Sequence, residues 1–411
     1  MSGILKDART GAHPISATTG RPPMDAPGAT GQAGGGGDVI RIARTLMMAV
    51  TATALVVAAS LLGDPGVARA AAPRRITIAF SGEDLATAGT WPRAKSNAGG
   101  RGYDFGPMLA RLRPLLSSVD LAICHLETPL AGPGVSRSDY PRYAVPPQLA
   151  DAIEAAGYDG CSTASNHAID RGAAGVRTTL DRLDALGLLH TGTARSAREG
   201  GRTTMYAVGG VKIAHLSFTA SFNGLTPTEP WQANRLEPAR ILEDARLARR
   251  RGADVVVVSL HWGGEFRHDP TAYQRDVAVR LMRGDAIDLI VGHHAHVVQP
   301  IRRVEGNWVA YGMGNSFSGM RDELSHAYVQ DGYVLVAVFE HGSNGWHVEK
   351  VRFAPTWVVP GTFVVRLVGP SLGDGTLPGA ILAELRRSWR RTVGFVDAKR
   401  LGVWPIRAST I

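Results

Sequence analysis

Side chains able to bind metal ions recur in this sequence, each time just after a short apolar run. Five such groups occur, and together they supply carboxylates, an amide and imidazoles. Their members are Glu83 and Asp84; His125 and Glu127; Asn166, His167 and Asp170; His261 and Glu265; and His293, His294 and His296. Carboxylate, amide and imidazole donors together suit Mn, Zn or Fe. The pattern therefore predicts a site for one or two divalent metal ions.

The spacing within the last group favours a shared centre. His294 and His296 are separated by one residue, so in an extended segment both side chains point to the same face. Both imidazoles could then reach one ion.

Each residue also has an interpretation that needs no metal. A single histidine after a strand is more often hydrogen-bonded or solvent-facing than a ligand, and Asn-His is a frequent turn or cap. Asp84 and Asp170 fit turn or helix-capping roles, which is the interpretation we favour for each of them taken alone. The repetition after five successive apolar runs is what favours a metal site.

The apolar runs have the length and the β-branched content of strands, and helical patterns separate them. The predicted strands are 76–80, 121–124, 160–163, 255–260 and 287–291. The predicted helices are 108–116, 147–156, 173–186, 238–251 and 273–282. Alternating strands and helices predict a layered α/β fold with a partly parallel sheet. Such sheets carry their sites at the carboxyl ends of the strands, where these donors fall.

Two hairpins and a late helix complete the body. Residues 206–208 and 211–218 flank Gly209-Gly210, and 332–339 is followed by a second β-rich run at 346–353, which predicts a mixed second sheet. In 381–393 the apolar residues share one helical face and four arginines share another. This helix is expected to dock on the body, and the alternative is an anionic membrane surface.

The N-terminal region has the composition of a leader. Residues 1–38 are rich in Gly, Ala, Pro and Thr and are predicted to be disordered. Residues 39–72 combine a basic flank, an apolar run at 46–62 and the small-residue site Ala68-Arg69-Ala70. They predict either a signal peptide cut after Ala70 or a retained membrane anchor. In both cases the body, a domain at 74–355 with an extension at 356–411, is expected outside the cytoplasm, at the cell membrane or in the extracellular envelope.

In an oxidising compartment Cys124 and Cys161 could form a single disulfide, and the alternative is two buried thiols. These two cysteines are also too few for a zinc or iron-sulfur site made of cysteines alone.

Composition and motifs exclude several classes of protein. The 45 basic and 36 acidic residues give a net charge of +9 at pH 7, but the basic residues are mostly arginines without a run of five. Diffuse arginine is a weak signal, so we expect no nucleic-acid partner. A Walker loop, a dinucleotide-binding glycine motif and a Gly-x-Ser-x-Gly elbow are all absent from the sequence. Nucleoside triphosphatases, Rossmann oxidoreductases and serine hydrolases are therefore excluded.

Five segments resemble the CapA family, bacterial capsule-biosynthesis proteins associated with poly-γ-glutamate that share the fold of calcineurin-like metallophosphoesterases. These segments are DLAICHLETPL at 120–130, SNHAIDRG at 165–172, SLHWGGEF at 259–266, GHHAHVVQP at 292–300 and YGMGN at 311–315. Their order and spacing match over about residues 76–320, which is far more specific than any single motif.

The resemblance implies a four-layer αββα sandwich with a metal site at the rims of its sheets. It assigns six residues as metal ligands and one as an acid. The implied ligands are Glu83, Glu127 as a bridge, Asn166, His261, His294 and His296. His167 matches the position that protonates a leaving oxygen, a role that imidazole can perform near neutral pH.

The sequence departs from the family pattern in its first motif. The usual Gly-Asp is replaced by Gly82-Glu83-Asp84. Three alternatives follow: the longer glutamate serves, Asp84 takes its place, or the first metal binds weakly. Relative to true phosphoesterases, the histidine of the first motif is missing and His125-Leu126-Glu127 replaces the Gly-Asp of the second.

Two functions remain open. One is an exported metal-dependent hydrolase, acting on a phosphoester or on an acidic polymer. The other is a non-catalytic partner of a membrane-bound poly-γ-glutamate synthase and exporter.

Overall fold

A computed structural model describes residues 74–322, 328–396 and 404–406, which belong to one compact unit, Ala72–Ile411. The expected leader, the export signal and Ala70 lie outside these residues. Within the described ranges, no helix is both long and apolar enough to span a membrane.

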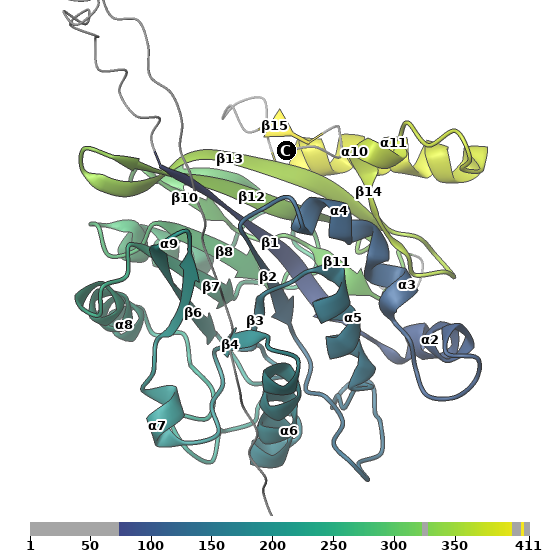
Figure 1. The fold of residues 1–411 in the computed structure, drawn as a ribbon, viewed down its shortest axis with the longest axis horizontal. Coiled ribbons are helices and arrows are strands. Elements are labelled where there is room, and N and C mark those ends of the chain that lie inside the picture. The colour runs from purple at the N-terminus through teal and green to yellow at the C-terminus, as the bar shows by residue number, and fades with distance from the viewer. Residues whose placement is uncertain (1–73, 323–327, 397–403, 407–411) are drawn as a thin grey trace, which may run out of the picture. The chain divides into compact units, whose positions relative to one another are not determined.

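The first sheet has β1 near its centre (Figure 1). Its strands run in the order β14-β13-β12-β1-β2-β3-β4, while β11 pairs with β1 and β15 with β13. From β1 to β4 the pairing is parallel, whereas β12, β13 and β14 pair antiparallel. The strands are β1 (Arg75–Leu85), β2 (Leu121–Leu126), β3 (Gly160–Ser162), β4 (Leu189–Thr191), β11 (Asn315–Ser318), β12 (Asp331–Gly342), β13 (Gly345–Val358), β14 (Val365–Leu367) and β15 (Trp404–Pro405).

The second sheet runs in the order β5-β6-β7-β8-β10-β9. Its four inner strands are parallel, and the edge strands β5 and β9 pair antiparallel. The strands are β5 (Thr204–Val208), β6 (Val211–Thr219), β7 (Val255–His261), β8 (Leu289–His293), β9 (Ile301–Val304) and β10 (Asn307–Ala310).

Side chains that alternate between the two faces of each sheet explain the layers of the fold. Ile78 and Phe80 of β1 pack with Val255 and Val257 of β7 in a core between the two sheets. Their neighbours face outward, as Ala79 does, into a second core on the far side of the first sheet. Side chains of a strand alternate between faces, so each sheet presents one apolar face to the other sheet and one to helices.

Helices cover both outer faces, as Figure 1 shows. The first sheet packs against α3 (Gly106–Leu109), α4 (Arg113–Leu116), α5 (Gln148–Ala156) and α6 (Gly172–Ala185). The second packs against α8 (Pro238–Arg250) and α9 (Ala272–Met282). The layer order is therefore helix, sheet, sheet, helix, which confirms the expected αββα sandwich. The remaining helices are η1 (Ala88–Thr90), α2 (Trp91–Asn97), α7 (Ala197–Gly200), α10 (Val368–Ser371) and α11 (Gly379–Val396).

Four of the five predicted helices occur within a residue or two of their predicted bounds. The exception is 108–116, which is broken into α3, η2 (Ala110–Leu112) and α4. Pro107 and Pro114 stand in the first turns of α3 and α4. A proline lacks the N–H that would continue the preceding helix, so each proline begins a new one.

Both predicted hairpins form, but one belongs elsewhere than expected. β5 and β6 make the edge hairpin of the second sheet. The hairpin β12–β13 joins the first sheet, beside β1, so both sheets are mixed and the expectation for this hairpin was wrong. The alternating pattern specifies the pairing of the two strands but not the sheet that accepts them.

The C-terminal part packs on the first sheet. Residue 355, the expected domain boundary, falls inside β13. Leu385 of α11 is buried in a cluster with Trp357, Val359 and Val368, and Trp389 packs against this cluster. The expected docking of this helix on the body is therefore confirmed.

Cys124 and Cys161 form a disulfide between β2 and β3. They are register partners in the parallel pair, with their Cα atoms 4.5 Å apart. The alternative of two free thiols is thus wrong.

Candidate functional site

The carboxyl ends of β1, β2, β7 and β8 bring acidic and imidazole side chains together. Glu83 of β1 is the register partner of His125 of β2, and His261 of β7 is the partner of His293 of β8. All four are buried. The strands run further than predicted, so these residues lie within the strand ends rather than after them.

Glycines allow neighbouring chains to approach this rim. A Cβ on Gly82 would lie 1.7 Å from the carbonyl oxygen of Gly314, and one on Gly292 would lie 1.9 Å from that of Tyr311. Only glycine fits such contacts, which explains the residue type that precedes Glu83 and His293.

Glu83, and not Asp84, points into the site. One carboxylate oxygen of Glu83 accepts a hydrogen bond from the backbone N–H of His294. Asp84 points to the other face, where its charge raises the pKa of Tyr158 further, after the larger effect of burial. Burial raises the pKa of Glu83 and of Asp84 to about 8. Of the two acidic residues in the first motif, Glu83 is therefore the one that faces the site, and because Asp84 lies inside β1 its expected turn or capping role was wrong.

His294 and His296 reach the site through turns rather than an extended segment. Their φ angles are 91° and 57°, in the left-handed region, and β8 has already ended at His293. The expectation of an extended His-x-His was therefore wrong. The two rings still lie near each other, with centroids 6.3 Å apart, because the turn and not the strand periodicity directs them inward.

Glu127 is the most isolated carboxylate of the site. It is fully buried, and neither of its carboxylate oxygens has a hydrogen-bond partner among the described residues. Burial, followed by the charge of Glu83, raises its pKa well above the usual range. A buried carboxyl without partners is costly unless a proton or a cation compensates it.

Imidazole nitrogens surround this carboxyl group. The Nε2 atoms of His296 and His261 lie 3.8 and 4.0 Å from Glu127 Oε1. Burial lowers the pKa of His296 to about 3 and that of His294 to about 4, and it holds the pKa of His261 well below its usual range. The rings are therefore neutral at physiological pH, which is the form that binds metals.

A chain of hydrogen bonds supports His261. His125 Nδ1 lies 2.8 Å from Ser162 Oγ, His125 Nε2 lies 2.9 Å from His261 Nδ1, and His261 Nε2 lies 2.9 Å from Asn166 Oδ1. All three contacts are hydrogen bonds only when every proton points toward Asn166, because Asn166 Oδ1 can only accept. When all protons point back, Ser162 Oγ donates to the carbonyl oxygen of Cys124 at 3.3 Å, but His261 Nε2 and Asn166 Oδ1 are then two acceptors that must separate. The second arrangement leaves His261 Nε2 as a free acceptor.

His167 stands beside this cluster with its own carboxylate partner. Its Nδ1 lies 2.7 Å from Asp170 Oδ2, and its ring meets Tyr143 edge-on. Asp170 caps no helix, because α6 begins at Gly172 after Arg171 and has no side-chain cap. Of the turn or capping role that the sequence favoured, capping was therefore wrong and the turn is confirmed, since the N–H of Asp170 donates to the carbonyl oxygen of His167. The carboxylate of Asp170 fixes the orientation of the imidazole.

Two other candidates lie outside the inner ring of donors. Glu265 is exposed in the turn after β7, and its charge acts on Glu127. His293 is buried and stacks on His125 with centroids 3.9 Å apart. Burial lowers its pKa to about 3.

Sequence reasoning missed three residues that touch these side chains. Asn315 Oδ1 accepts from His296 Nδ1 at 3.0 Å, Asn223 Nδ2 lies 3.4 Å from His167 Nε2, and Arg142 Nη1 lies 3.4 Å from Asp170 Oδ1. Asn315 could have been found, because it is the last residue of the segment at 311–315 that resembles the family. Asn223 and Arg142 lie in loops and carry no such signal.

The chemistry of the donors fits a divalent cation. Glu83 Oε2, both oxygens of Glu127 and His294 Nδ1 are buried without a hydrogen-bond partner in the part of the chain that the structure describes. In the same residues, no group of three or more His, Cys, Asp and Glu side chains is assembled to hold a metal as it stands. His261 and Asn166 bond to each other instead. Binding an ion would thus require these two side chains to separate.

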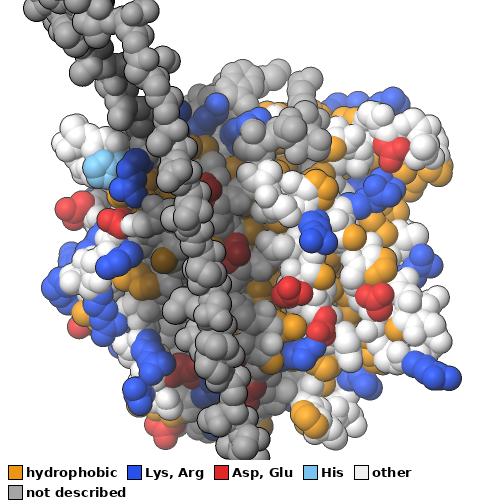
Figure 2. All heavy atoms as spheres, in the orientation of Figure 1, with side chains coloured by type: hydrophobic (Ala, Val, Ile, Leu, Met, Phe, Trp, Pro, Cys, Tyr) orange, Lys and Arg blue, Asp and Glu red, His pale blue; other side chains and the backbone are white. Residues whose placement is uncertain are grey.

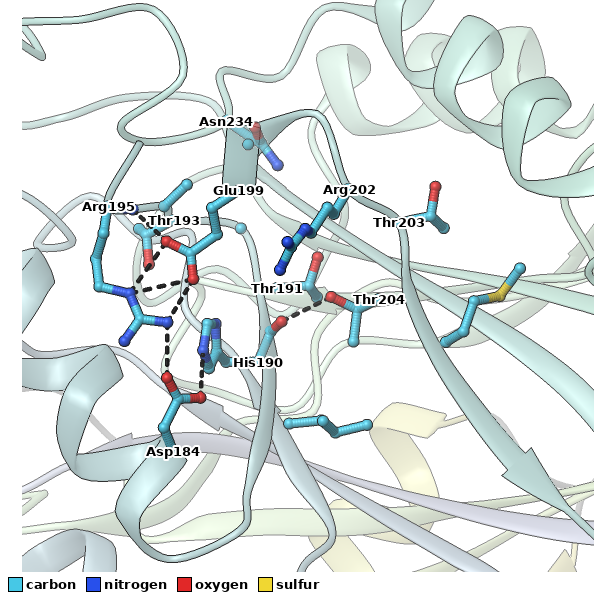
Figure 3. A pocket seen from close by; sticks show the side chains of 15 residues that line it. Asp184, His190, Thr191, Thr193, Arg195, Glu199, Arg202, Thr203, Thr204 and Asn234 are labelled. Carbon is cyan, nitrogen blue, oxygen red and sulfur yellow. Dashed lines mark hydrogen bonds and ion pairs between the residues drawn. The ribbon is translucent and has the colours of Figure 1, made fainter. Parts of the chain in front are cut away.

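A different cavity of about 430 Å³ lies at the edge strands β4 and β5 (Figure 3). Arg195 pairs there with Asp184 and Glu199, and His190 with Asp184. None of the predicted site residues lines it.

The layers and the strand-end cluster together define an αββα sandwich that gathers acidic and imidazole side chains at the carboxyl ends of its strands. Residues 77–320 match the model of the family described as bacterial capsule synthesis protein PGA_cap. The chain belongs to this family.

Individual relatives match over shorter stretches. The PGA biosynthesis protein CapA of Bacillus subtilis is 35% identical over 162 residues, which are 38% of this chain and 41% of that protein. A probable polyglutamine synthesis accessory protein of Mycobacterium tuberculosis is 26% identical over 227 residues, 52% of this chain and 59% of that protein. The chain thus spans less than two thirds of either relative. Among solved structures, the calcineurin-like phosphoesterase YfkN of Bacillus subtilis is similar with a TM-score of 0.45 and 13% identity, over 79% of this chain and 99% of that one.

Proposed function

We propose that this protein is an exported, metal-dependent hydrolase of the phosphoesterase type that acts on an acidic envelope polymer or a phosphoester during capsule synthesis. The carrying observation is the buried carboxyl group of Glu127, which has no hydrogen-bond partner among the described residues and lies 3.8 and 4.0 Å from the Nε2 atoms of His296 and His261. The name of the CapA relative supports poly-γ-glutamate as the polymer.

The residues proposed to hold one or two ions of Mn, Fe or Zn share buried donor atoms near Glu127. They are Glu83, Glu127, Asn166, His261, His294 and His296. A bound divalent ion would supply Lewis acidity. Beside it, Asp170 would accept from His167 Nδ1–H, and the doubly protonated ring would give its Nε2 proton to the leaving oxygen. Tyr143 shields one side of this ring from water.

The test uses the full chain. We expect stoichiometric metal by mass spectrometry and hydrolysis of bis-aryl phosphate that Mn restores after chelation. Glu127→Gln and His294→Ala should lose both metal and activity. His167→Gln should keep the metal and lose roughly 10²- to 10⁴-fold in rate. Absence of bound metal, or a Glu127→Gln variant as active as wild type, would contradict the proposal.

A second candidate function is a non-catalytic partner of a membrane-bound poly-γ-glutamate synthase. The bond between His261 and Asn166 favours it, as does the accessory role in the name of the mycobacterial relative. On this alternative the chain would bind the polymer and co-purify with the synthase, and chelation would change neither behaviour.

A further inference from the structure

The loop before α5 places an arginine next to the acid pair of His167 and Asp170. Arg142 Nη1 lies 3.4 Å from Asp170 Oδ1, and its Nη2 lies 3.5 Å from the carbonyl oxygen of Asn223. Asn223 in turn contacts His167 Nε2. The guanidinium group therefore stands at the rim of the site, on the side of the proposed proton donor.

The loop is held firmly by a second arginine. Arg171 Nε donates to the carbonyl oxygen of Tyr143 at 3.1 Å, and its Nη2 donates to that of Arg142 at 2.7 Å. The N–H of Tyr143 donates to Asp170 Oδ2 at 2.8 Å. The backbone that carries Arg142 is thus fixed to the same aspartate that orients His167.

The two arginines differ in how many of their side-chain N–H donors already have partners. Arg171 donates to two backbone carbonyls of the loop and to Ser138 Oγ. Among the described residues the guanidinium group of Arg142 makes two contacts, both long, and its side chain is 39% exposed while that of Asp170 is fully buried. Arginine carries five N–H donors in a planar fork, so Arg142 has further donors for a ligand.

The positive charge of Arg142 gives this rim of the site a feature that could bind a ligand. The guanidinium group of Arg142 carries a permanent positive charge, and its contacts place it beside Asp170 and Asn223. At this rim it would attract a negatively charged group to the place where His167 acts.

We propose that Arg142 binds an oxyanion of the substrate, a phosphate oxygen or a glutamyl carboxylate, next to the leaving group that His167 protonates. The site would therefore select substrates with a negative charge close to the bond that is cleaved. This assignment rests on the proposed function for its catalytic meaning, but oxyanion binding can be measured without turnover.

The experiment measures binding to the full chain in excess chelator by calorimetry. The probes are inorganic phosphate, a γ-linked glutamate pentamer and the same pentamer with esterified carboxylates. Wild type should bind at least one acidic probe and not the ester. Binding of phosphate alone indicates a phosphoester substrate, and binding of the pentamer alone indicates the polymer.

Arg142→Gln should weaken binding roughly 10- to 100-fold, the loss expected for one charge-assisted hydrogen bond. Arg142→Lys should recover part of it, because it keeps the charge but not the fork. Arg137→Gln is the matched control, since Arg137 lies exposed in the same stretch of chain and stacks over Tyr103, 4.8 Å from the ring centroid. It should bind like wild type.

Three results would overturn the assignment: wild type binds neither acidic probe, Arg142→Gln binds as tightly as wild type, or Arg137→Gln loses as much as Arg142→Gln. A loss of metal binding or hydrolysis would instead reject the proposed function and leave this result standing, because no metal takes part in the measurement.

Discussion

The orientation of His261 depends on a serine two residues removed along a hydrogen-bond chain. Ser162 Oγ contacts His125 Nδ1, and His125 Nε2 contacts His261 Nδ1. If His261 Nε2 is to bind a metal, its proton must sit on Nδ1, and Ser162 must accept at the far end. Removing a group that fixes the tautomer of a ligand histidine typically weakens metal binding.

Ser162→Ala should therefore lower metal affinity by about 10-fold or more while leaving the fold intact. Competition with a chromogenic chelator measures the affinity. Ser217→Ala is the matched control, because Ser217 is also buried but its Oγ has no hydrogen-bond partner among the described residues. Equal affinities for the two variants would reject a role for the chain.

His215, which is not one of the proposed ligands, makes the stability of the fold depend on pH. It is buried, with Nε2 2.8 Å from Ser259 Oγ, and burial lowers its pKa to about 3. Its unfolded value is about 6.5. Between pH 6.5 and about 3 the unfolded chain binds more protons than the folded one, so the stability due to this group is complete above 6.5 and lost as pH falls.

His215→Gln removes this group and should make the free energy of unfolding depend less steeply on pH between 6.5 and 4. Urea unfolding across this range, with chelator present, provides the measurement. His347→Gln, at an exposed histidine, should keep the wild-type slope. An unchanged slope in His215→Gln would show that the ring is not buried in its neutral form.

At the scale of elements, the strands and their terminal donors were predictable because buried parallel strands read as apolar runs. The residues 255–260, for example, precede His261 directly, and β7 is buried along its whole length. The contacts within the site were not predictable in the same way. Glu83 meets His294 across 211 positions of sequence, and the left-handed turns at His294 and His296 follow from that packing rather than from local residue types.

The role of Asp170 shows the same limit. From local sequence, an aspartate shortly before a helix is expected to cap it. Nothing in the sequence indicates that the loop at Arg142 and Tyr143 contacts Asp170. Only the tertiary fold brings this loop to both oxygens of the aspartate. The αββα order, by contrast, followed from five motifs whose order and spacing fix a whole family.

The disulfide joins β2 and β3 at the point where the hydrogen-bond chain to His261 begins. Cys124 and Cys161 immediately precede His125 and Ser162. Their separation of 37 residues closes a loop that restricts the unfolded chain. Such a link contributes about 4 kcal/mol in the loop-entropy view of disulfides.

The double variant Cys124→Ser/Cys161→Ser should lose about 4 kcal/mol of unfolding free energy in urea. Reductant should lower the stability of wild type toward the same value and leave the double variant unchanged. Alkylation of two thiols in wild type without reductant, read by intact mass, would contradict the disulfide.

At the scale of the whole molecule, basic and acidic side chains are interspersed over the face seen in Figure 2, in agreement with the modest net charge of +9. The C-terminal helix α11 contributes several arginines, and one of them is structural. Arg391 donates to both oxygens of the buried Asp331, at 2.6 and 3.0 Å, and lies over the ring of Tyr328.

This ion pair ties α11 to the site through the segment beside it. Asn315 Nδ2 donates to the carbonyl oxygen of Val329 at 2.9 Å, and Asn315 Oδ1 holds His296. Phe395 of α11 also stacks on His268, whose Nδ1 bonds to the carbonyl oxygen of Val298. A helix that follows the segment matching the family thus supports both flanks of His296.

Arg391→Leu should therefore cost about 3 kcal/mol of stability, because it leaves the carboxylate of Asp331 buried without its partner. It should also lower metal affinity, since the support of Asn315 and His296 loosens. Arg387→Leu is the control: Arg387 pairs with Glu384 on the surface, a contact worth at most about 1 kcal/mol. Urea unfolding and chelator competition on both variants measure the two effects. If Arg391→Leu had wild-type stability and wild-type metal affinity, α11 would only cover the sheet and would not support the site.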